Sequence, residues 1–280
     1  WSDDFGGART GTWETTSGFA NSPASTVVVT GNTSAGENQP GWLFNRDTNT
    51  DTPYEFNETT SSIGDGALYV APIDGVNPND KFIAENFINT PITNVDSISY
   101  DFKIGSGGDE TDKVHFYMNV YANFGSSSDL KFYDCRYNVV PTVGSTGAFT
   151  NVTFDPTQAY PVTTRAGGDP SPYPCPAIPA DMNTSSAGSN IRMFALNVGD
   201  SSASDLGLDG YLDKVVVDLE NTTTTYDFEL DMPDNTAPAV PTILTPACGS
   251  TGTSAELTSI DWTDSTDTSA PVTYMYEASL

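Results

Sequence analysis

Two stretches in which apolar and polar residues alternate constrain this chain more than any other feature. Successive side chains of a β-strand point to opposite sides, so a period of two predicts one buried and one solvated side. The pattern therefore predicts antiparallel sheets that cover a core. The buried sets are Ile98, Tyr100, Phe102 and Ile104 in Ser97–Ile104, and Val114, Phe116, Met118, Val120, Ala122 and Phe124 in Lys113–Phe124.

Short apolar runs bounded by Gly, Pro, Asn and Ser recur along residues 1–230, and none has the pattern of an amphipathic helix. Many short strands with turn signals between them predict an all-β, antiparallel β-sandwich of the jelly-roll type. Ile191–Val198 is apolar on both sides and is expected to be a central strand. The other predicted strands are Ser25–Thr30, Gly66–Val70, Lys81–Ile88, Leu130–Val140, Phe149–Phe154, Tyr211–Leu219 and Thr223–Leu230.

The composition changes after Leu230. Residues 231–241 are polar and rich in proline, which is typical of a linker between domains. Residues 242–280 contain three short strand candidates, Thr242–Thr245, Ala255–Trp262 and Val272–Ala278. A complete sandwich domain needs roughly 100 residues. We therefore expect a partial domain after the linker, completed by further chain or by strands from a partner.

The charge of the chain excludes two classes of function. Its 280 residues include Lys+Arg 10 and Asp+Glu 37, a formal net charge of −27. Such a field repels phosphate backbones and anionic membrane surfaces, so nucleic-acid binding and membrane association are not expected. No apolar run reaches the roughly 18 residues of a membrane helix. After Lys214 the sequence has no Lys or Arg, so we expect repulsion to extend the linker and spacer.

Several features suit a secreted protein. The chain opens at Trp1 without Met or a leader, as it would after removal of a signal peptide or in a trimmed chain. Of its three cysteines, Cys135 and Cys175 are predicted to form a disulfide that fastens a long loop; two buried thiols are the alternative. Cys248 is left over. Glycosylation sequons, which also arise by chance in a chain rich in Asn and Thr, stand at Asn32, Asn57, Asn151, Asn183 and Asn221.

Four short motifs carry a resemblance over residues 1–230. They are Asp3–Phe5, Gly64–Val70, Ser97–Lys103 and Gly210–Val217. With them the chain resembles the concanavalin-like and carbohydrate-binding-module jelly rolls of secreted bacterial proteins. Residues 235–280 look like the first strands of a fibronectin type III or Ig-like repeat, through Asp234–Pro238, Pro246–Gly249, Ile260–Trp262 and Pro271–Glu277. The layout is similar to bacterial surface proteins with a lectin-like module beside Ig-like spacers.

Calcium is the expected cofactor, because a cation cancels the repulsion of clustered carboxylates. Asp47, Asn49 and Asp51 place oxygens at alternate positions, followed by Glu58, although a loop rich in Asx turns is the alternative. Asp213 is in phase with Tyr211, Val215 and Val217, so it is expected to point toward the core, where a carboxylate needs a partner. The jelly-roll resemblance implies that Asp4 and Asp213 hold a structural calcium; a hydrogen-bonded turn is the alternative.

A candidate glycan-binding surface lies on the polar side of Lys113–Phe124. Aromatic rings bind the apolar side of a sugar, and amides bind its hydroxyl groups. The alternative is an ordinary polar sheet surface with tyrosines that favour β-structure, or one covered by the 155–186 loop. The candidate residues are His115, Tyr117, Asn119, Tyr121 and Asn123.

Catalysis is not expected. The chain has one histidine, and it contains no Gly-x-Ser-x-Gly elbow and no strand–loop–helix cradle for phosphate. Our leading prediction is a secreted, non-enzymatic cell-surface protein with an adhesive or structural role, such as a subunit of a filament or surface layer. A glycan-binding module on an Ig-like stalk is the alternative. The expected partners are accordingly further copies of the chain, through strand exchange, or glycans.

Overall fold

The computed structural model describes residues 24–31, 42–44, 54–71, 73, 81–126, 133–164, 173–199, 207–230, 243–245 and 261–262. The chain divides into two compact units, Trp1–Asp231 and Met232–Leu280. In the second unit, the described residues are the short antiparallel pair β14 (Ile243–Thr245) and β15 (Asp261–Trp262). The Pro-rich linker, Cys248 and most of the Ig-like segment lie outside the described residues, so the Ig-like repeat stays a prediction.

The first unit contains a seven-stranded sheet built around β12 (Gly210–Leu219). One edge of β12 pairs with β6 (Val95–Ile104), which in turn pairs with β9 (Thr150–Phe154). The other edge is shared between β4 (Ala67–Val70) and β13 (Thr222–Leu230). Beyond them, β3 (Tyr54–Asn57) pairs with β4, and β1 (Ala24–Gly31) runs parallel to β13.

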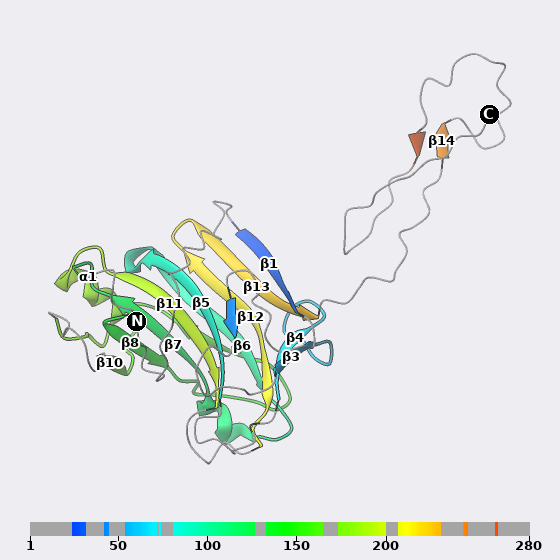
Figure 1. Ribbon diagram of the computed structural model, residues 1–280, viewed down its shortest axis with the longest axis horizontal. Helices are drawn as coiled ribbons and strands as arrows, with labels where there is room; N and C mark the ends of the chain where they lie inside the picture. The colour runs from blue at the N-terminus through cyan, green and yellow to red at the C-terminus, as the bar shows by residue number, and fades with distance from the viewer. Residues whose placement is uncertain are drawn as a thin grey trace. The chain divides into compact units, whose positions relative to one another are not determined.

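The second layer is a six-stranded antiparallel sheet (Figure 1). Its strand order is β10 (Val162–Thr164), β8 (Cys135–Val139), β7 (Phe116–Asn123), β11 (Asn190–Val198), β5 (Phe82–Pro91) and β2 (Trp42–Phe44). The helices among the described residues are short: η1 (Ile92–Asn94), η2 (Glu110–His115), η3 (Pro179–Asp181) and α1 (Met182–Ser185).

The two sheets enclose one large aromatic core. Trp42 is 1% exposed, and its ring meets Phe194 of its own sheet in an edge-on contact at 5.7 Å. Across the core it meets Tyr226 and Phe228 of β13 at 5.3 and 5.2 Å. Edge-to-face ring pairs add stability beyond the apolar area that they bury. One side chain from a three-residue strand thus joins both sheets.

The structure confirms the predicted fold class, a mainly antiparallel all-β sandwich, and the central position of β11 between β7 and β5. The sequence analysis missed β2, β3 and β10. Each has only three or four residues, which is too short for a period of two to stand out.

One predicted strand begins later than expected. Lys113, Val114 and His115 belong to η2, and Val114 is 45% exposed rather than buried. The cause is a capping box in which the Asp109 side chain accepts from the backbone of the first turn and Asp112 accepts from the Asp109 N–H. These local hydrogen bonds favour a helical turn over the extended chain.

A disulfide joins Cys135 of β8 to Cys175, the pair expected from the sequence, at a sequence separation of 40. Closing a loop of this length restricts the unfolded chain. In the chain-entropy model we therefore expect Cys175→Ser to lower the free energy of unfolding by about 4 kcal/mol. Urea denaturation without reductant measures this loss. The matched control is Cys248→Ser in the second unit; equal stability of the two variants would contradict the prediction.

Candidate functional site

The predicted glycan surface lies on the outer side of the six-stranded sheet, away from the large core. Tyr117, Asn119, Tyr121 and Asn123 of β7 alternate with core residues and share this side. His115 does not extend the pattern, because it ends η2 before the strand begins. The structure therefore brings four of the five candidates together on one strand.

The centre of this sheet surface is packed rather than open. Tyr121 is 0% exposed, and Asn119 and Asn123 are each 4% exposed. The Tyr121 ring meets Tyr133 edge-on at 5.0 Å, within a second apolar cluster that also holds Ile83, Met193 and Ala195. Tyr117 is half-buried. The described structure thus gives Tyr121 the role of a core residue.

The register places further polar residues on the same side, which the sequence analysis missed. Asn138 of β8 lies opposite Asn119, and Asn197 of β11 lies opposite Tyr117. The Asn197 amide donates to the Ala195 carbonyl at 3.0 Å. The register also aligns Glu85 of β5 with Ala195. No local pattern could reveal this grouping, because it depends on the register between β5, β7, β8 and β11.

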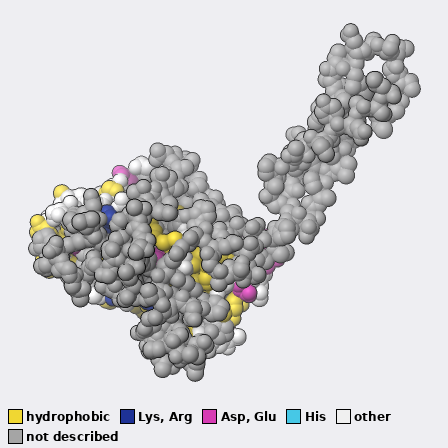
Figure 2. All heavy atoms as spheres, in the orientation of Figure 1, with side chains coloured by type: hydrophobic (Ala, Val, Ile, Leu, Met, Phe, Trp, Pro, Cys, Tyr) yellow, Lys and Arg dark blue, Asp and Glu magenta, His cyan; other side chains and the backbone are white. Residues whose placement is uncertain are grey.

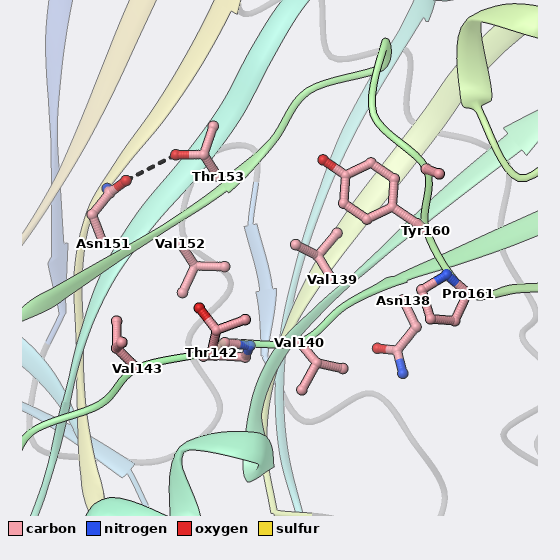
Figure 3. A pocket seen from close by; sticks show the side chains of 12 residues that line it. Asn138, Val139, Val140, Thr142, Val143, Asn151, Val152, Thr153, Tyr160 and Pro161 are labelled. Atoms are coloured by element: carbon pink, nitrogen blue, oxygen red, sulfur yellow. Dashed lines mark hydrogen bonds between the residues drawn. The ribbon is translucent and has the colours of Figure 1, made fainter.

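Asn138 also lines a hollow of about 440 Å³ at the edge of the sandwich (Figure 3). The hollow lies between the end of β8 and β9, and the turns at 140–143 and 159–161 close it. Its walls comprise Asn138, Val139, Val140, Pro141, Thr142, Val143, Asn151, Val152, Thr153, Ala159, Tyr160 and Pro161. None of these residues carries a charge, although the chain as a whole has a net charge of −27.

The floor of the hollow is apolar and rigidly held. Figure 3 shows Val139, Val152 and Tyr160 converging on it from three segments. The Tyr160 ring stacks on Phe154 at 5.2 Å, and its hydroxyl accepts from the Asp155 N–H at 2.8 Å. Val140 and Val143 at the rim are 39% and 62% exposed. An apolar partner that binds here would therefore remove both its own surface and that of the two valines from water, which favours binding.

The polar side chains of the wall differ in where they point. Asn151 and Thr153 share the side of β9 opposite to Val152, where Thr153 donates to Asn151 and the Asn151 amide donates to Asp101 at 2.7 Å. The Asn138 side chain faces the side of β8 opposite to Val139, and its oxygen is buried without a hydrogen-bond partner among the described residues. Thr142 points toward the apolar floor (Figure 3), so its hydroxyl group can bond a ligand there.

The phase of Asp213 with Val215 and Val217 predicted that its side chain points toward the core. In the structure it points to the other side of the sheet. The register of β12 shifts between Asp213 and Val216, where Lys214 has φ 45°. A bulge inserts one residue and reverses the side on which later side chains point. Asp213 therefore lies on the outer side of the seven-stranded sheet, in phase with Tyr211, and is nevertheless 0% exposed.

Backbone N–H groups satisfy the buried Asp213 carboxylate. One oxygen accepts from Ser62 and Ile63 at 2.7 and 3.0 Å, and the other accepts from Lys214 at 2.6 Å and Phe228 at 3.4 Å. Burial raises the pKa of this carboxyl, against the lowering effect of the four hydrogen bonds. This is the hydrogen-bonded arrangement that the sequence analysis held as the alternative to calcium.

A metal centre of acidic, histidine or cysteine side chains requires a particular spacing of those groups. No three such side chains among the described residues have this spacing. The acidic pair beside Asp213 is Asp227 and Glu229, and one buried oxygen of Asp227 has no hydrogen-bond partner within the described part of the chain. Asp4, Asp47, Asn49 and Asp51 lie outside the described residues, so the calcium sites stay predictions.

Chelation tests calcium directly. An ion that binds only the folded state raises the free energy of unfolding by about 2.7 kcal/mol at a hundredfold excess over its Kd. We therefore expect EDTA to lower the melting temperature of the wild-type protein, and Asp51→Asn, which changes a predicted ligand, to weaken that response. Asp109→Asn, on the exposed cap of η2, is the control. A melting temperature that EDTA leaves unchanged contradicts the prediction.

Asp227 and Glu229 form a proton-sharing pair against the loop at Gly64. The Asp65 N–H donates to Glu229 at 2.8 Å, and Gly64, with φ 62°, leaves no room for a Cβ beside the two carboxyl groups. Burial, with the Asp227 charge as a smaller cause, raises the pKa of Glu229 from 4.5 to about 7. Burial also raises the pKa of Asp227.

This pair predicts a pH dependence of stability. A raised pKa means that folded Glu229 holds its proton more tightly than the unfolded chain does. Its contribution is therefore present below pH 4.5 and lost as the pH rises toward 7. We expect Glu229→Gln to reduce the fall in melting temperature across this range, whereas Glu58→Gln, at an exposed position, leaves it unchanged. Equal slopes for the two variants would exclude this role.

The sequons differ in the environment of their asparagine. Asn151 donates its amide to Asp101, and Asn183 accepts from the Gly188 N–H at 2.9 Å. Asn57 ends β3, and its side chain accepts from the Thr59 N–H at 3.2 Å. Asn221 is exposed between β12 and β13, and Asn32 lies outside the described residues. Glycosylation stays a prediction; of the described acceptors, Asn151 and Asn221 are exposed, and Asn57 and Asn183 are half-buried.

Comparison with known proteins found no matching family model and no matching curated protein. Among solved structures, the xylan-binding domain CBM22-1 of Paenibacillus barcinonensis Xyn10C is similar at 10% identity, over 65% of this chain and 87% of that one, with a TM-score of 0.35. The C-terminal family 22 carbohydrate binding module of Clostridium thermocellum Xyn10B is similar at 11% identity, over 64% and 87%, with a TM-score of 0.32. A family 16 carbohydrate binding module is similar at 12% identity, over 60% and 86%, with a TM-score of 0.32.

Proposed function

We propose that the first unit binds a neutral carbohydrate in the hollow between β8 and β9, without catalysing a reaction. The observation that carries this proposal is the chemistry of the hollow wall. It combines an apolar floor and one tyrosine ring with amide and hydroxyl groups, and it has no charged residue. A sugar ring has the complementary chemistry, with C–H groups on its faces and hydroxyl groups around its edge.

The size and polar groups of the hollow support this ligand class. Pockets of roughly 300–1,000 Å³ with apolar walls and a few placed polar groups are typical of small-ligand sites. The hollow, at about 440 Å³, falls in this range. The Thr142 hydroxyl group would bond a sugar hydroxyl, and the Tyr160 ring would lie against C–H groups. Direct hydrogen bonds of this kind give a site its specificity.

The negative charge of the protein favours neutral glycans over anionic ones. A net charge of −27 repels uronic, sulfated and sialylated polymers. An uncharged wall also offers an anionic sugar no counter-charge. The disulfide suits an oxidising compartment, which supports a secreted protein. No helix among the described residues combines the length and the apolar content that a membrane span needs.

The adhesive role predicted from the sequence follows if the bound glycan belongs to a cell surface or a matrix. Binding requires no strand exchange and no filament. Figure 2 shows hydrophobic side chains of the described residues at several places on this side of the molecule. Three large hydrophobic side chains of the described residues are exposed, namely Val114, Val140 and Val143. Val140 and Val143 line the hollow.

The test uses two valines that differ in position but resemble each other in exposure. Val143→Asp places a carboxylate in the wall of the hollow, and Val114→Asp places one on η2 outside it. Exposed substitutions of this kind change stability by about 0.5 kcal/mol or less. We expect Val143→Asp to weaken glycan binding at least about tenfold, or 1.4 kcal/mol, because a bound sugar would desolvate the new charge. Val114→Asp should bind like the wild type.

Affinity electrophoresis through gels that contain xylan, mixed-linkage β-glucan, mannan or polygalacturonate measures the effect. Retardation by a neutral polymer but not by polygalacturonate is the expected pattern. Thr142→Val should weaken the same interaction by removing the hydroxyl group of the wall. If none of the polymers retards the wild type, or if Val143→Asp is retarded equally, the hollow is not a carbohydrate site.

A further inference from the structure

Four side chains form a row across the outer side of the seven-stranded sheet, away from the hollow wall. We call Glu55 of β3, Tyr69 of β4, Tyr211 of β12 and Lys103 of β6 the tyrosine row. The register places Glu55 opposite Tyr69, Tyr69 opposite Tyr211, and Tyr211 opposite Lys103. All four side chains are half-buried, so each keeps some contact with solvent.

The two rings make a shallow aromatic platform. Their centroids lie 4.9 Å apart with an interplanar angle of 42°, close to the spacing of neighbouring strands. The Lys103 ammonium group lies 5.6 Å from the Tyr211 ring centre, within reach of a cation–π interaction. The row therefore presents a carboxylate at one end, two rings in the middle and an ammonium group at the other end.

Buried groups behind the row hold it in place. The Tyr69 hydroxyl donates to Asp209 at 2.9 Å, and the other oxygen of Asp209 accepts from the Gly107 N–H at 2.6 Å. Asp209 is 4% exposed, and a Cβ on Gly105 would lie 2.3 Å from its carboxyl group. Lys103 donates to Thr60 at 3.3 Å. Side chains that are already ordered lose little entropy when a ligand binds.

Packing within the sheet is the simplest alternative role for the row. Ring pairs and cation–π contacts stabilise a fold without any ligand. Burial and the neighbouring Asp209 raise the pKa of Tyr69, so its hydroxyl stays a donor to that carboxylate. A purely structural pair, however, gains most when both rings are fully buried, as in the large core. Here both rings stay partly exposed, between charged side chains that keep their own contact with water.

We infer that the tyrosine row is a second carbohydrate-binding surface, which takes an extended neutral glycan lying across β3, β4, β12 and β6. Tyr69 and Tyr211 would lie beneath successive sugar units. Glu55 would accept hydrogen bonds from hydroxyl groups, and Lys103 would donate to them. This inference shares with the proposed function only the class of ligand, since none of the four residues lines the hollow.

Two surfaces on one unit would act together on a polymer. The hollow, at about 440 Å³, is compact and suits a single sugar unit or chain end, whereas the row crosses four strands. A polymer that reaches both would be bound more tightly than a short oligosaccharide, because the second contact becomes intramolecular.

Isothermal titration with short neutral oligosaccharides, namely xylotetraose, cellotetraose and mannotetraose, counts the sites. We expect two bound oligosaccharides per wild-type chain and one per chain for Tyr211→Ala. Tyr211→Phe, which keeps the ring, should retain both. Val216→Ala is the matched control, since Val216 lies half-buried on the same strand beyond the bulge. Lys103→Gln is a milder variant that should weaken one site and spare the other, and it covers the case in which Tyr211→Ala fails to fold.

The outcomes separate the two proposals. If Tyr211→Ala and Lys103→Gln bind like the wild type, while Val143→Asp loses all binding, the row is not a site and the hollow stands. If Tyr211→Ala loses all binding and Val143→Asp loses none, the row stands and the hollow does not. Absence of binding to all three oligosaccharides in the wild type overturns both.

Discussion

The contact between the two sheets depends on large aromatic side chains: the rings of Trp42, Phe44, Phe82 and Phe116 of one sheet meet rings of the other. Packed sheets lie about 10 Å apart, a space that rings fill well. Trp42 belongs to the edge strand β2 of one sheet, yet it contacts Tyr226 and Phe228 of the other. Phe44 and Phe82 stack beside it at 6.0 Å. The position of every outer surface follows from this core, because a strand that turns one side inward must turn the other outward.

The outer surfaces of the two sheets are covered in different ways. On the six-stranded sheet, Tyr121 and Met193 form a second apolar cluster, so the centre of that side is core. On the seven-stranded sheet, Asp213 accepts four backbone hydrogen bonds, two of them from Ser62 and Ile63 of the 58–66 loop. The tyrosine row stays partly exposed beside this loop. The two surfaces that we propose for binding therefore lie at the sandwich edge and on this row, rather than on the strand whose polar pattern is plainest.

Much of the fold could be read from the sequence. Alternation in Ser97–Ile104 placed Ile98, Tyr100 and Phe102 in the core, where they are 0% exposed. The apolar run Ile191–Val198 identified a central strand. The hollow could not be predicted in the same way, because Asn138 and Tyr160 are brought together by packing between segments that no local pattern links. Tyr69 and Tyr211 were visible as residues, but their pairing depends on the register between β4 and β12.

The phase of Asp213 shows where local patterns stop. A period of two is reliable only while a strand is regular, and the bulge at Lys214 reverses it. By itself, the sequence determined the fold class, the excess of negative charge and the set of residues able to fill the core, since these depend on composition and on neighbours along the chain. Only the tertiary structure decided which polar side chains meet. Those contacts join strands far apart in sequence, and their register is set by packing across the whole sandwich.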